Sequence, residues 1–594
     1  MFRHTRISSK ELRFSAYDAA RLGTGRERMI PAMEFAVFIA AAALITVAVL
    51  AVSALSSRRK LRRRLEADYG QVPSRRYDEY VAESVASLWR LQKQAENPPF
   101  EVDDTTWRDL DMDAVFRRCN AACSSAGEEY LYAALRNPRA EEDDLRRLDA
   151  AARCLDADPA LRLRVQVLLS GCGRITGNGV ADFFAHPGEK RLRFAPLYPL
   201  LSLGAVLSLC SIPFLRAGSI VWILLMFVVN IAVYYKTKAP LEAELVSLRC
   251  AAALLGGAAK LARLRVPEEL APCTRRLAEL GRPLRRIGRF AGSIMGKSGS
   301  DLDFLAEYVK IFFQLDFLAY NSVLSTVAKH RESCGEIYRA VGFLDAAVSV
   351  ASFRRSLPLW CVPQLGADTF ALRGLVHPLL ENPVGNSVEL QRSALITGSN
   401  ASGKSTFVKA VAVNAILAQS LATCAAVSFA LPVCRVMTSM AVADSLDTGE
   451  SYYIAEIKSL KRILDALETG PFCLCLIDEI LKGTNTVERI AASAAVLGSL
   501  REKRCLVLAA THDIELTELL EGVYDNFHFE ERVSDEGVAF DYTIREGRAT
   551  TKNAIRLLGA LGYPEPVVET ARRLAGGFEQ TRAWRMPPET RGRN

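Results

Sequence analysis

Residues 397–406 constrain the fold of this chain more than any other segment. They read Thr-Gly-Ser-Asn-Ala-Ser-Gly-Lys-Ser-Thr and match the phosphate-binding pattern G-x-x-x-x-G-K-[ST]. The apolar run 393–396 before the loop is typical of a buried strand, and the apolar stretch 407–421 after it is typical of a buried helix. In that setting the backbone N–H groups of the loop face phosphate oxygens at a helix N-terminus. The sequence therefore predicts an α/β P-loop domain that binds a nucleoside triphosphate with Mg²⁺.

The residues of this loop have separate expected roles. We expect Lys404 to reach the β- and γ-phosphates and the Ser405 hydroxyl to bind Mg²⁺. Gly398 and Gly403 allow the backbone to curl around the phosphates. The other residues expected to contact the nucleotide are Ser399, Asn400, Ala401, Ser402 and Thr406. The alternative, a chance glycine-rich turn, is disfavoured by the flanking strand and helix patterns.

Two further apolar strands end in polar residues that suit the same site. Residues 472–479 end in Asp478 and Glu479. We expect Asp478 to hold Mg²⁺ through water and Glu479 to deprotonate the attacking water. Residues 506–513 bring His512 to a third strand end, where we expect it to sense the γ-phosphate. Each pattern alone also fits ordinary surface polar residues, but three strand ends together indicate one catalytic site.

Residues 447–457 begin a predicted helix that continues to Leu467. One interpretation is structural: Ser451 caps the helix while Ile454 and Ile457 pack inward. The functional interpretation is a signature helix whose N-terminus, at Ser451, points at the γ-phosphate bound by another subunit.

These four elements, in this order, resemble the ATPase domain of the MutS family, an ABC-type P-loop fold. The similar patterns are T-G-x-N-x-x-G-K-S-T at 397–406, G-x-S-x-(aromatic)-x-x-E at 449–456, D-E-x-x-x-G-T-x-T at 478–486 and A-T-H-x-x-E-L at 510–516. Additional similarity occurs at His377-Pro378, 541–547 and 554–564. The resemblance covers about residues 366–577.

The resemblance implies a homodimer in which ATP lies between the loop of one subunit and the Ser451 helix of the other. Lys404 and Mg²⁺ would neutralise the developing charge, Glu479 would activate water and His512 would position it. ATP would close the dimer, and hydrolysis would release it.

The resemblance upstream is looser. Residues 110–138 and 342–352 are similar to the beginning and the end of the family's helical lever domain. The predicted fold is therefore an α/β P-loop (ABC-type) ATPase domain plus an all-α lever-like domain and three transmembrane helices. The expected order begins with a basic leader that need not be native (1–33), a first transmembrane helix (34–56), a cytoplasmic helical region (57–193) and a transmembrane hairpin (194–236). The lever-like domain (237–365), the ATPase domain (366–577) and a tail (578–594) follow.

The membrane prediction rests on two apolar blocks, of which the second is interrupted by a turn that contains Arg216. Residues 35–55 carry no charge, are long enough to cross a bilayer and are followed by five arginines and one lysine within 58–64. Residues 194–235 would form a hairpin that turns at 215–219, again with basic residues at both outer ends. The positive-inside rule then predicts a multi-pass protein of the cell membrane with its ATPase domain in the cytoplasm. The alternatives are a signal peptide for the first block and buried core helices for the second.

Composition supports this assignment and limits others. Half of the residues are hydrophobic, the mean hydropathy is +0.10 and the formal net charge is +8. Fourteen cysteines are scattered without zinc-site spacing, so we expect a reducing compartment and no structural metal.

The target of the ATPase is open at this stage. We find no G-x-F-(Y)-E wedge, so mismatch reading is not expected, although the family label is DNA mismatch repair. A DNA-binding ATPase could use a cluster of arginines that equally suits a solvated helix face near anionic lipid: Arg275, Arg276, Arg282, Arg285, Arg286 and Arg289. The alternative is an ATP-driven membrane signalling or mechanical module without a nucleic-acid ligand. A transporter is disfavoured because three spans are few for a solute path and the two arms of the hairpin contain no intramembrane charge.

Overall fold

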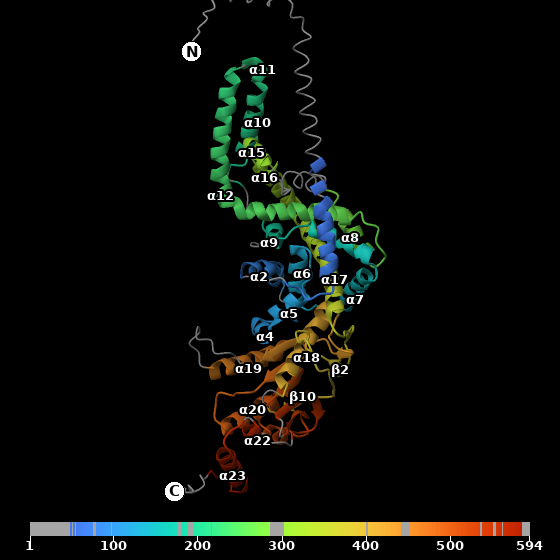
Figure 1. The fold of residues 1–594 in the computed structure, drawn as a ribbon, viewed down its shortest axis with the longest axis vertical. Helices are drawn as coiled ribbons and strands as arrows, with labels where there is room; N and C mark the ends of the chain where they lie inside the picture. The colour runs from blue at the N-terminus through green and yellow to red at the C-terminus, as the bar shows by residue number, and fades with distance from the viewer. Residues whose placement is uncertain are drawn as a thin grey trace, which may run out of the picture. The chain divides into compact units, whose positions relative to one another are not determined.

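The computed structural model describes residues 48–584 with short gaps (Figure 1). The gaps are 50–51, 54, 75–78, 97, 140, 175–179, 188–191, 193, 216, 285–301, 400–401, 441–451, 535–536, 550–553, 561 and 582. The chain divides into two compact units, the larger comprising Leu65–Gly296 and Ala306–Asn594. In the smaller unit the described residues at 48–64 and 302–305 are helical. All contacts reported below lie within the larger unit.

The described residues between Leu65 and Ser356 form helices joined by turns. These helices are α2 (Glu79–Val85), α3 (Ser87–Ala95), α4 (Asp104–Asp109), α5 (Met112–Cys119), α6 (Ser125–Arg136), α7 (Glu142–Ala157), α8 (Pro159–Ser170), α9 (Val180–Ala185), α10 (Leu197–Cys210), α11 (Ile212–Leu215), α12 (Ala217–Leu261), α13 (Ala271–Leu280), α15 (Leu302–Phe312), α16 (Leu315–Lys329) and α17 (Arg331–Ser356). α17 is buried along most of its length and contacts α6, α7 and α13.

A buried carboxylate joins α17 to the start of α6. Asp345 is fully buried and accepts hydrogen bonds from the backbone N–H groups of Cys123 and Ser124, both at 2.8 Å, and from the Ser124 hydroxyl at 2.6 Å. A helix N-terminus presents unpaired N–H groups and a positive dipole end, so a carboxylate is favourable there. Burial raises the pKa of Asp345, although these donors and the positive charge of Arg174 oppose that shift.

The apolar hairpin differs from its prediction. Within the described residues, one helical segment is long and apolar enough to cross a bilayer, Ala217–Glu242 of α12, with 26 residues and a mean hydropathy of 2.2. The other predicted arm is α10, which has only 14 residues, whereas a perpendicular span needs about 20. The predicted first span, 35–55, lies largely outside the described residues. Three transmembrane helices are therefore not supported.

α12 is also much longer than the predicted arm, which ended near Tyr235. It continues as one helix of 45 residues to Leu261 with Pro240 inside it. Its second half is buried against the helical core through Leu245, Leu248 and Leu255. Tertiary packing of that half explains why the helix does not stop at the basic residues that follow the apolar segment.

The remaining residues form a mixed α/β region with two sheets. A six-stranded sheet has the order β10-β9-β4-β8-β7-β6, and a four-stranded sheet has the order β1-β5-β2-β3. The strands are β1 (Gln364–Leu365), β2 (Phe370–Leu375), β3 (Asn386–Leu390), β4 (Ala394–Thr397), β5 (Ser428–Leu431), β6 (Arg435–Ser439), β7 (Cys473–Asp478), β8 (Cys505–Ala510), β9 (Asp525–Ser534) and β10 (Gly537–Glu546). The helices are α18 (Lys404–Leu421), α19 (Tyr452–Thr469), α20 (Thr486–Leu500), α21 (Glu515–Leu519), α22 (Ala554–Ala560) and α23 (Glu565–Thr581).

The larger sheet is parallel from β6 to β9, and only β10 pairs antiparallel. β4, β7 and β8 are apolar and buried along almost their whole length, as expected for a parallel sheet covered on both faces. The carboxyl ends of β4, β7 and β8 therefore meet at one edge of the sheet, where ligands bind in open α/β folds.

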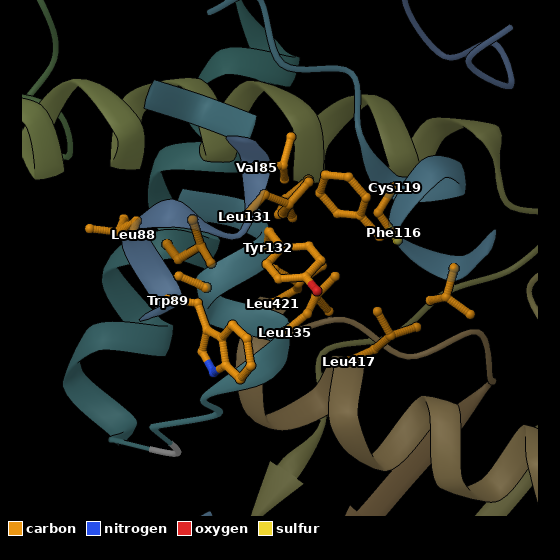
Figure 2. Close-up of a cluster of buried hydrophobic side chains, with 14 of the residues drawn as sticks. Val85, Leu88, Trp89, Phe116, Cys119, Leu131, Tyr132, Leu135, Leu417 and Leu421 are labelled. Carbon is orange, nitrogen blue, oxygen red and sulfur yellow. The ribbon is translucent and has the colours of Figure 1, made fainter. Parts of the chain in front are cut away.

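The helical layer packs directly on the helix that follows the phosphate-binding loop. Figure 2 shows Leu417 and Leu421 of α18 beside Tyr132 and Leu135 of α6. A second contact uses Arg354 of α17, whose guanidinium donates to the Ala422 carbonyl at 2.8 Å, just after α18. The same guanidinium pairs with Asp149 of α7 at 2.6 Å and reaches the Thr423 hydroxyl at 2.9 Å. α18 is thus joined to α6 by packing and to α17 by a buried charge.

Candidate nucleotide-binding site

The predicted phosphate-binding loop connects β4 to α18. Its two glycines adopt positive φ angles, +146° at Gly398 and +106° at Gly403, in a region that L-residues with side chains rarely adopt. A Cβ atom on Gly398 would lie 2.7 Å from the carbonyl oxygen of Phe529 in β9. Gly403 immediately precedes α18, so the loop ends at a helix N-terminus as the sequence predicted.

Lys404 lies at the centre of the site. Its side chain is buried, and Nζ donates to the carbonyl oxygens of Gly398 at 2.9 Å and Ser399 at 2.7 Å. Nζ also lies 3.4 Å from Nε2 of His512. Burial lowers the pKa of Lys404 to about 8, and the carboxylates of Asp478 and Glu479 oppose this shift. The ammonium group thus occupies the loop and faces two strand-end carboxylates.

Two buried oxygen atoms in this site have neither a hydrogen-bond partner nor an ion-pair partner among the described residues. They are Oδ1 of Asp478, at the end of β7, and Oγ of Ser402, within the loop. The Ser405 side chain is exposed in the first turn of α18. Carboxylate, hydroxyl and water oxygens are the ligands that Mg²⁺ prefers. The unpartnered Asp478 oxygen therefore fits a magnesium ligand better than a structural carboxylate, which would be satisfied by protein donors.

Glu479 and His512 form the second pair of the site. Oε1 of Glu479 lies 2.8 Å from Nε2 of His512, and Oε2 is ion-paired with Lys482. The Glu479 backbone has φ +57°, and its N–H donates to the Ala510 carbonyl of β8 at 2.9 Å. Burial opposes ionisation of this carboxylate, but Lys482 and His512 outweigh it and hold the Glu479 pKa below its ordinary value. The carboxylate therefore stays ionised near neutral pH.

The other predicted site residues differ in how far the structure describes them. Thr406 is exposed at the start of α18, beside Ser405. Asn400, Ala401 and Ser451 lie outside the described residues, so the proposed contact of Ser451 with a second subunit remains a prediction.

The helix that follows Ser451 contacts the segment after β7. Tyr453 of α19 packs against Gly483, where an added Cβ would lie 3.0 Å from the tyrosine Cβ. Glu456 is buried, and its Oε1 accepts a hydrogen bond from the Lys482 N–H at 3.4 Å. The start of α19 is therefore tied to the segment that carries Glu479.

Two features of the site were not predicted from the sequence. The Ser399 hydroxyl donates to the buried carboxylate of Glu531 in β9. Arg489 of α20 makes two hydrogen bonds to Asp513, at 2.6 and 2.9 Å, next to His512. The first could have been found only from the pairing of β9 with β4, which local patterns do not reveal. The second had a sequence signal, an aspartate following the strand-end histidine.

The arginine cluster proposed for DNA is only partly described, because 285–301 lie outside the described residues. Arg275 pairs with Glu268 at 3.2 Å, and Arg276 pairs with Glu336. Both arginines remain exposed, as does Arg282. Carboxylates of the chain itself therefore already offset part of the positive charge of this surface.

Comparison with known proteins gives the same C-terminal assignment. Residues 394–579 match the family profile of MutS domain V. The DNA mismatch repair protein MutS of Natronomonas pharaonis is 32% identical over 276 residues, which is 45% of this chain and 32% of that protein. The protein of the same name from Thermotoga maritima is 31% identical over 268 residues, 43% of this chain and 33% of that protein.

These matches cover only part of this chain and part of each relative. The chain spans about a third of the length of the curated relatives it matches. The similarity supports the MutS family for the C-terminal half, with its mixed α/β fold.

Proposed function

We propose that this protein is an ATPase of the MutS type that binds ATP with Mg²⁺ at the carboxyl ends of β4, β7 and β8. The observation that carries the proposal is the Glu479–His512 pair at 2.8 Å, adjacent to the Lys404 ammonium. A base, a ring that can orient it and a cation that can neutralise phosphate are thereby gathered at one sheet edge. The similarity to MutS domain V over 394–579 supports the same conclusion.

Phosphate binding begins with the loop and Lys404. The loop glycines let backbone N–H groups approach phosphate oxygens, and α18 offers its positive dipole end. Lys404 leaves its contacts with the Gly398 and Ser399 carbonyls and moves its ammonium onto the β- and γ-phosphates. Ser405 and Asp478 would hold Mg²⁺, which when bound neutralises charge on the phosphate oxygens.

Hydrolysis requires a base that is ionised and correctly held. Glu479 is kept ionised by Lys482 and His512, and its backbone is fixed to β8. Its Oε1 accepts the proton of a water molecule that lies in line with the γ-phosphate. His512 keeps this carboxylate in place through Nε2 and lies close enough to Lys404 to register the γ-phosphate.

The dimeric form of the site is part of this proposal and rests on the family resemblance. Ser451 precedes α19 and would approach the γ-phosphate of a second subunit. Contacts between the start of α19 and the segment after β7 offer a route by which the second nucleotide affects Glu479. Closure on ATP and release after hydrolysis would then move α18 and, through Arg354, the helical layer.

Membrane attachment is supported by the exposure of the apolar hairpin. Only 17% of the most apolar window of Ala217–Glu242 is buried within the protein, whereas the core helix of a soluble domain is mostly buried. Trp222, Leu224 and Val228 of α12, together with Leu203 of α10, are exposed. An exposed apolar surface of this extent indicates an interaction site. We propose that it is embedded in the cell membrane, with the ATPase domain in the cytoplasm.

DNA is a proposed partner because the relatives are named as DNA mismatch repair proteins. Arg275, Arg276 and Arg282 are the described members of the basic cluster that would contact phosphates. The second candidate, a membrane signalling or mechanical module without DNA, is favoured by the internal pairing of Arg275 and Arg276 with Glu268 and Glu336. Salt-dependent DNA binding of the purified protein separates the two.

The Glu479→Gln variant tests the ATPase proposal. We expect it to bind ATP with unchanged affinity but to hydrolyse it about 10²–10⁴-fold more slowly, because the amide cannot accept the proton. Single-turnover hydrolysis and equilibrium nucleotide binding measure the two properties separately. Glu488→Gln, which changes an exposed carboxylate at the start of α20, is the matched control. Unchanged hydrolysis in Glu479→Gln would show that the base lies elsewhere.

A further inference from the structure

A break between α15 and α16 faces the apolar segment of α12. α15 ends at Phe312 and α16 begins at Leu315, so the helix is interrupted for two residues. Gln314 adopts φ +52° at this break, an unfavourable conformation for a residue with a long side chain. Such strain persists only where surrounding contacts hold it, and here those contacts come from α12.

Two side-chain amides hold the break in place. Nδ2 of Asn230 in α12 donates to the Phe312 carbonyl at 2.7 Å. Nε2 of Gln314 donates to the Asn230 carbonyl at 2.8 Å and to the Ile311 carbonyl at 3.1 Å. Backbone carbonyls can only accept, so these bonds fix which end of each amide is nitrogen. Oδ1 of Asn230 and Oε1 of Gln314 are therefore oxygen atoms, and both are buried without a donor among the described residues.

A carboxylate lies beside these amides. Asp316 is fully buried, and its Oδ2 accepts a hydrogen bond from the Tyr234 hydroxyl at 2.7 Å. Its other oxygen, Oδ1, has no donor within the described part of the chain. Tyr234 follows Asn230 by one helical turn, so both project from the same face of α12. Asp316 and Gln314 are two residues apart on the facing element.

The charged groups nearby leave Asp316 without an ion-pair partner in the described residues. Lys238 is engaged with Glu307 at 3.1 Å. Arg249 lies near enough to act electrostatically on Tyr234 and Glu307, and its buried Nε has no hydrogen-bond partner among the described residues, but it is not ion-paired with Asp316 there. Among the three residues with an unpartnered oxygen, Asn230, Gln314 and Asp316, only Asp316 is acidic.

These three residues lack hydrogen-bond donors but do not lack acceptors. The side-chain nitrogens of Asn230 and Gln314 donate hydrogen bonds. Their side-chain oxygens and Oδ1 of Asp316 accept none from the described residues. A buried polar atom without a partner is destabilising, so three unpartnered acceptors on residues around one helix break favour a positively charged ligand there. Carbonyl and carboxylate oxygens favour hard cations, and helix ends with unwound backbone bind Na⁺ in membrane proteins. The C-terminal dipole end of α15 adds to the attraction.

We propose that Asn230, Gln314 and Asp316 bind one monovalent cation of the size of Na⁺ at the break between α15 and α16. One positive charge balances the single carboxylate, whereas a divalent ion would leave a net charge among apolar side chains. The bound ion pins the break to α12 and thereby fixes the hairpin relative to α16. This inference is independent of the ATPase proposal, since it involves no residue of the nucleotide site.

Thermal unfolding of the purified full-length protein in detergent, without nucleotide, tests the site. Unfolding is compared in NaCl and in choline chloride at equal ionic strength, so that general screening is constant. An ion that binds only the folded protein raises the midpoint, and the rise grows with concentration as the site fills. We expect a rise of several degrees in Na⁺ that depends on its concentration. Equal midpoints in the two salts would overturn the proposal and leave ordered water as the partner of these oxygens.

Three variants localise the effect. Asp316→Asn should lose the response to Na⁺, whereas Glu279→Gln, which neutralises an exposed carboxylate of α13, should retain it. Gln314→Glu adds a second negative charge at the same place and should replace the Na⁺ response with a response to Ca²⁺. Equilibrium binding of radioactive Na⁺ should give one ion per chain in the unmodified protein. A full Na⁺ response in Asp316→Asn, or no ion bound, would refute the assignment even if ATP hydrolysis is normal.

Discussion

Asp345 in the helical layer and Asp478 in the nucleotide site are both buried carboxylates, yet their surroundings differ. Asp345 receives three hydrogen bonds from the start of α6. Asp478 has an oxygen that no described residue satisfies. A buried carboxylate that the chain satisfies completely stabilises the fold, whereas one left partly unsatisfied is available to a ligand. In this pair, unmet hydrogen-bonding capacity separates the two carboxylates, whereas burial does not.

The largest expected difference in stability and hydrolysis is between the alanine variants of these two aspartates. Asp345→Ala should lower the free energy of unfolding by about 3–5 kcal/mol, because three buried donors lose their acceptor. Asp478→Ala should leave stability unchanged or slightly raised but reduce ATP hydrolysis by about 10²-fold or more. Denaturant unfolding and steady-state hydrolysis measure both variants. A strong loss of stability in Asp478→Ala would remove the distinction.

Replacement of Arg354 tests the contact between the helical layer and the end of α18. Arg354→Met should lower the free energy of unfolding by about 2–4 kcal/mol, because Asp149 and the carbonyl after α18 lose a buried cation. Arg355→Met is the matched control. Arg355 is mostly exposed, and its ion pair with Asp156 at 3.5 Å is open to solvent. Loss of this weak pair should change the free energy of unfolding by less than about 1 kcal/mol. Equal effects would indicate that the buried guanidinium does not join the layers.

The tight contact beneath Asp345 predicts a smaller effect. A Cβ on Gly127 would lie 2.4 Å from a carboxylate oxygen of Asp345, so Gly127→Ala should be destabilising by about 1–3 kcal/mol. Gly498→Ala is the control, because its added Cβ meets nothing within 4 Å and it lies in α20. That change should stabilise the protein by about 0.5–1 kcal/mol. The comparison fails if both substitutions shift the unfolding midpoint in the same direction.

A further expected effect is the linkage between nucleotide binding and proton binding at Lys404. Without nucleotide the Lys404 pKa is about 8, and phosphate favours the charged ammonium, so binding raises that pKa. ATP binding above about pH 8 should therefore take up a proton, and affinity should fall by at most about tenfold per pH unit. Calorimetry in two buffers of different ionisation enthalpy measures the uptake. Lys404→Arg should abolish it, because arginine stays charged. Affinity that does not change between about pH 7 and 10 would contradict the assignment.

The chemistry of the site was predictable where it depends on short patterns. The loop, the Asp478-Glu479 pair and His512 each follow an apolar strand, and the sheet order brings these strand ends together. The contact of Ser399 with Glu531 was not predictable, because it depends on β9 pairing with β4 across a long stretch of sequence.

The fold was harder to predict in the helical region. Hydropathy located the apolar segment but indicated an end near Tyr235, whereas α12 continues into the core. Its continuation depends on packing partners far away in the sequence, including α8, α13 and α17. Asp345 and Asp316 likewise gave no local signal, because each is defined by what surrounds it after folding.

The continuity of α12 has a mechanical consequence. Its apolar half and the half buried in the helical core belong to one helix of 45 residues with Pro240 inside it, and the two halves point in different directions (Figure 1). Helical rods transmit torque, whereas flexible linkers absorb it. A movement of the core would therefore reach the hairpin through a continuous helix, and Pro240 marks a place along that helix where it can bend.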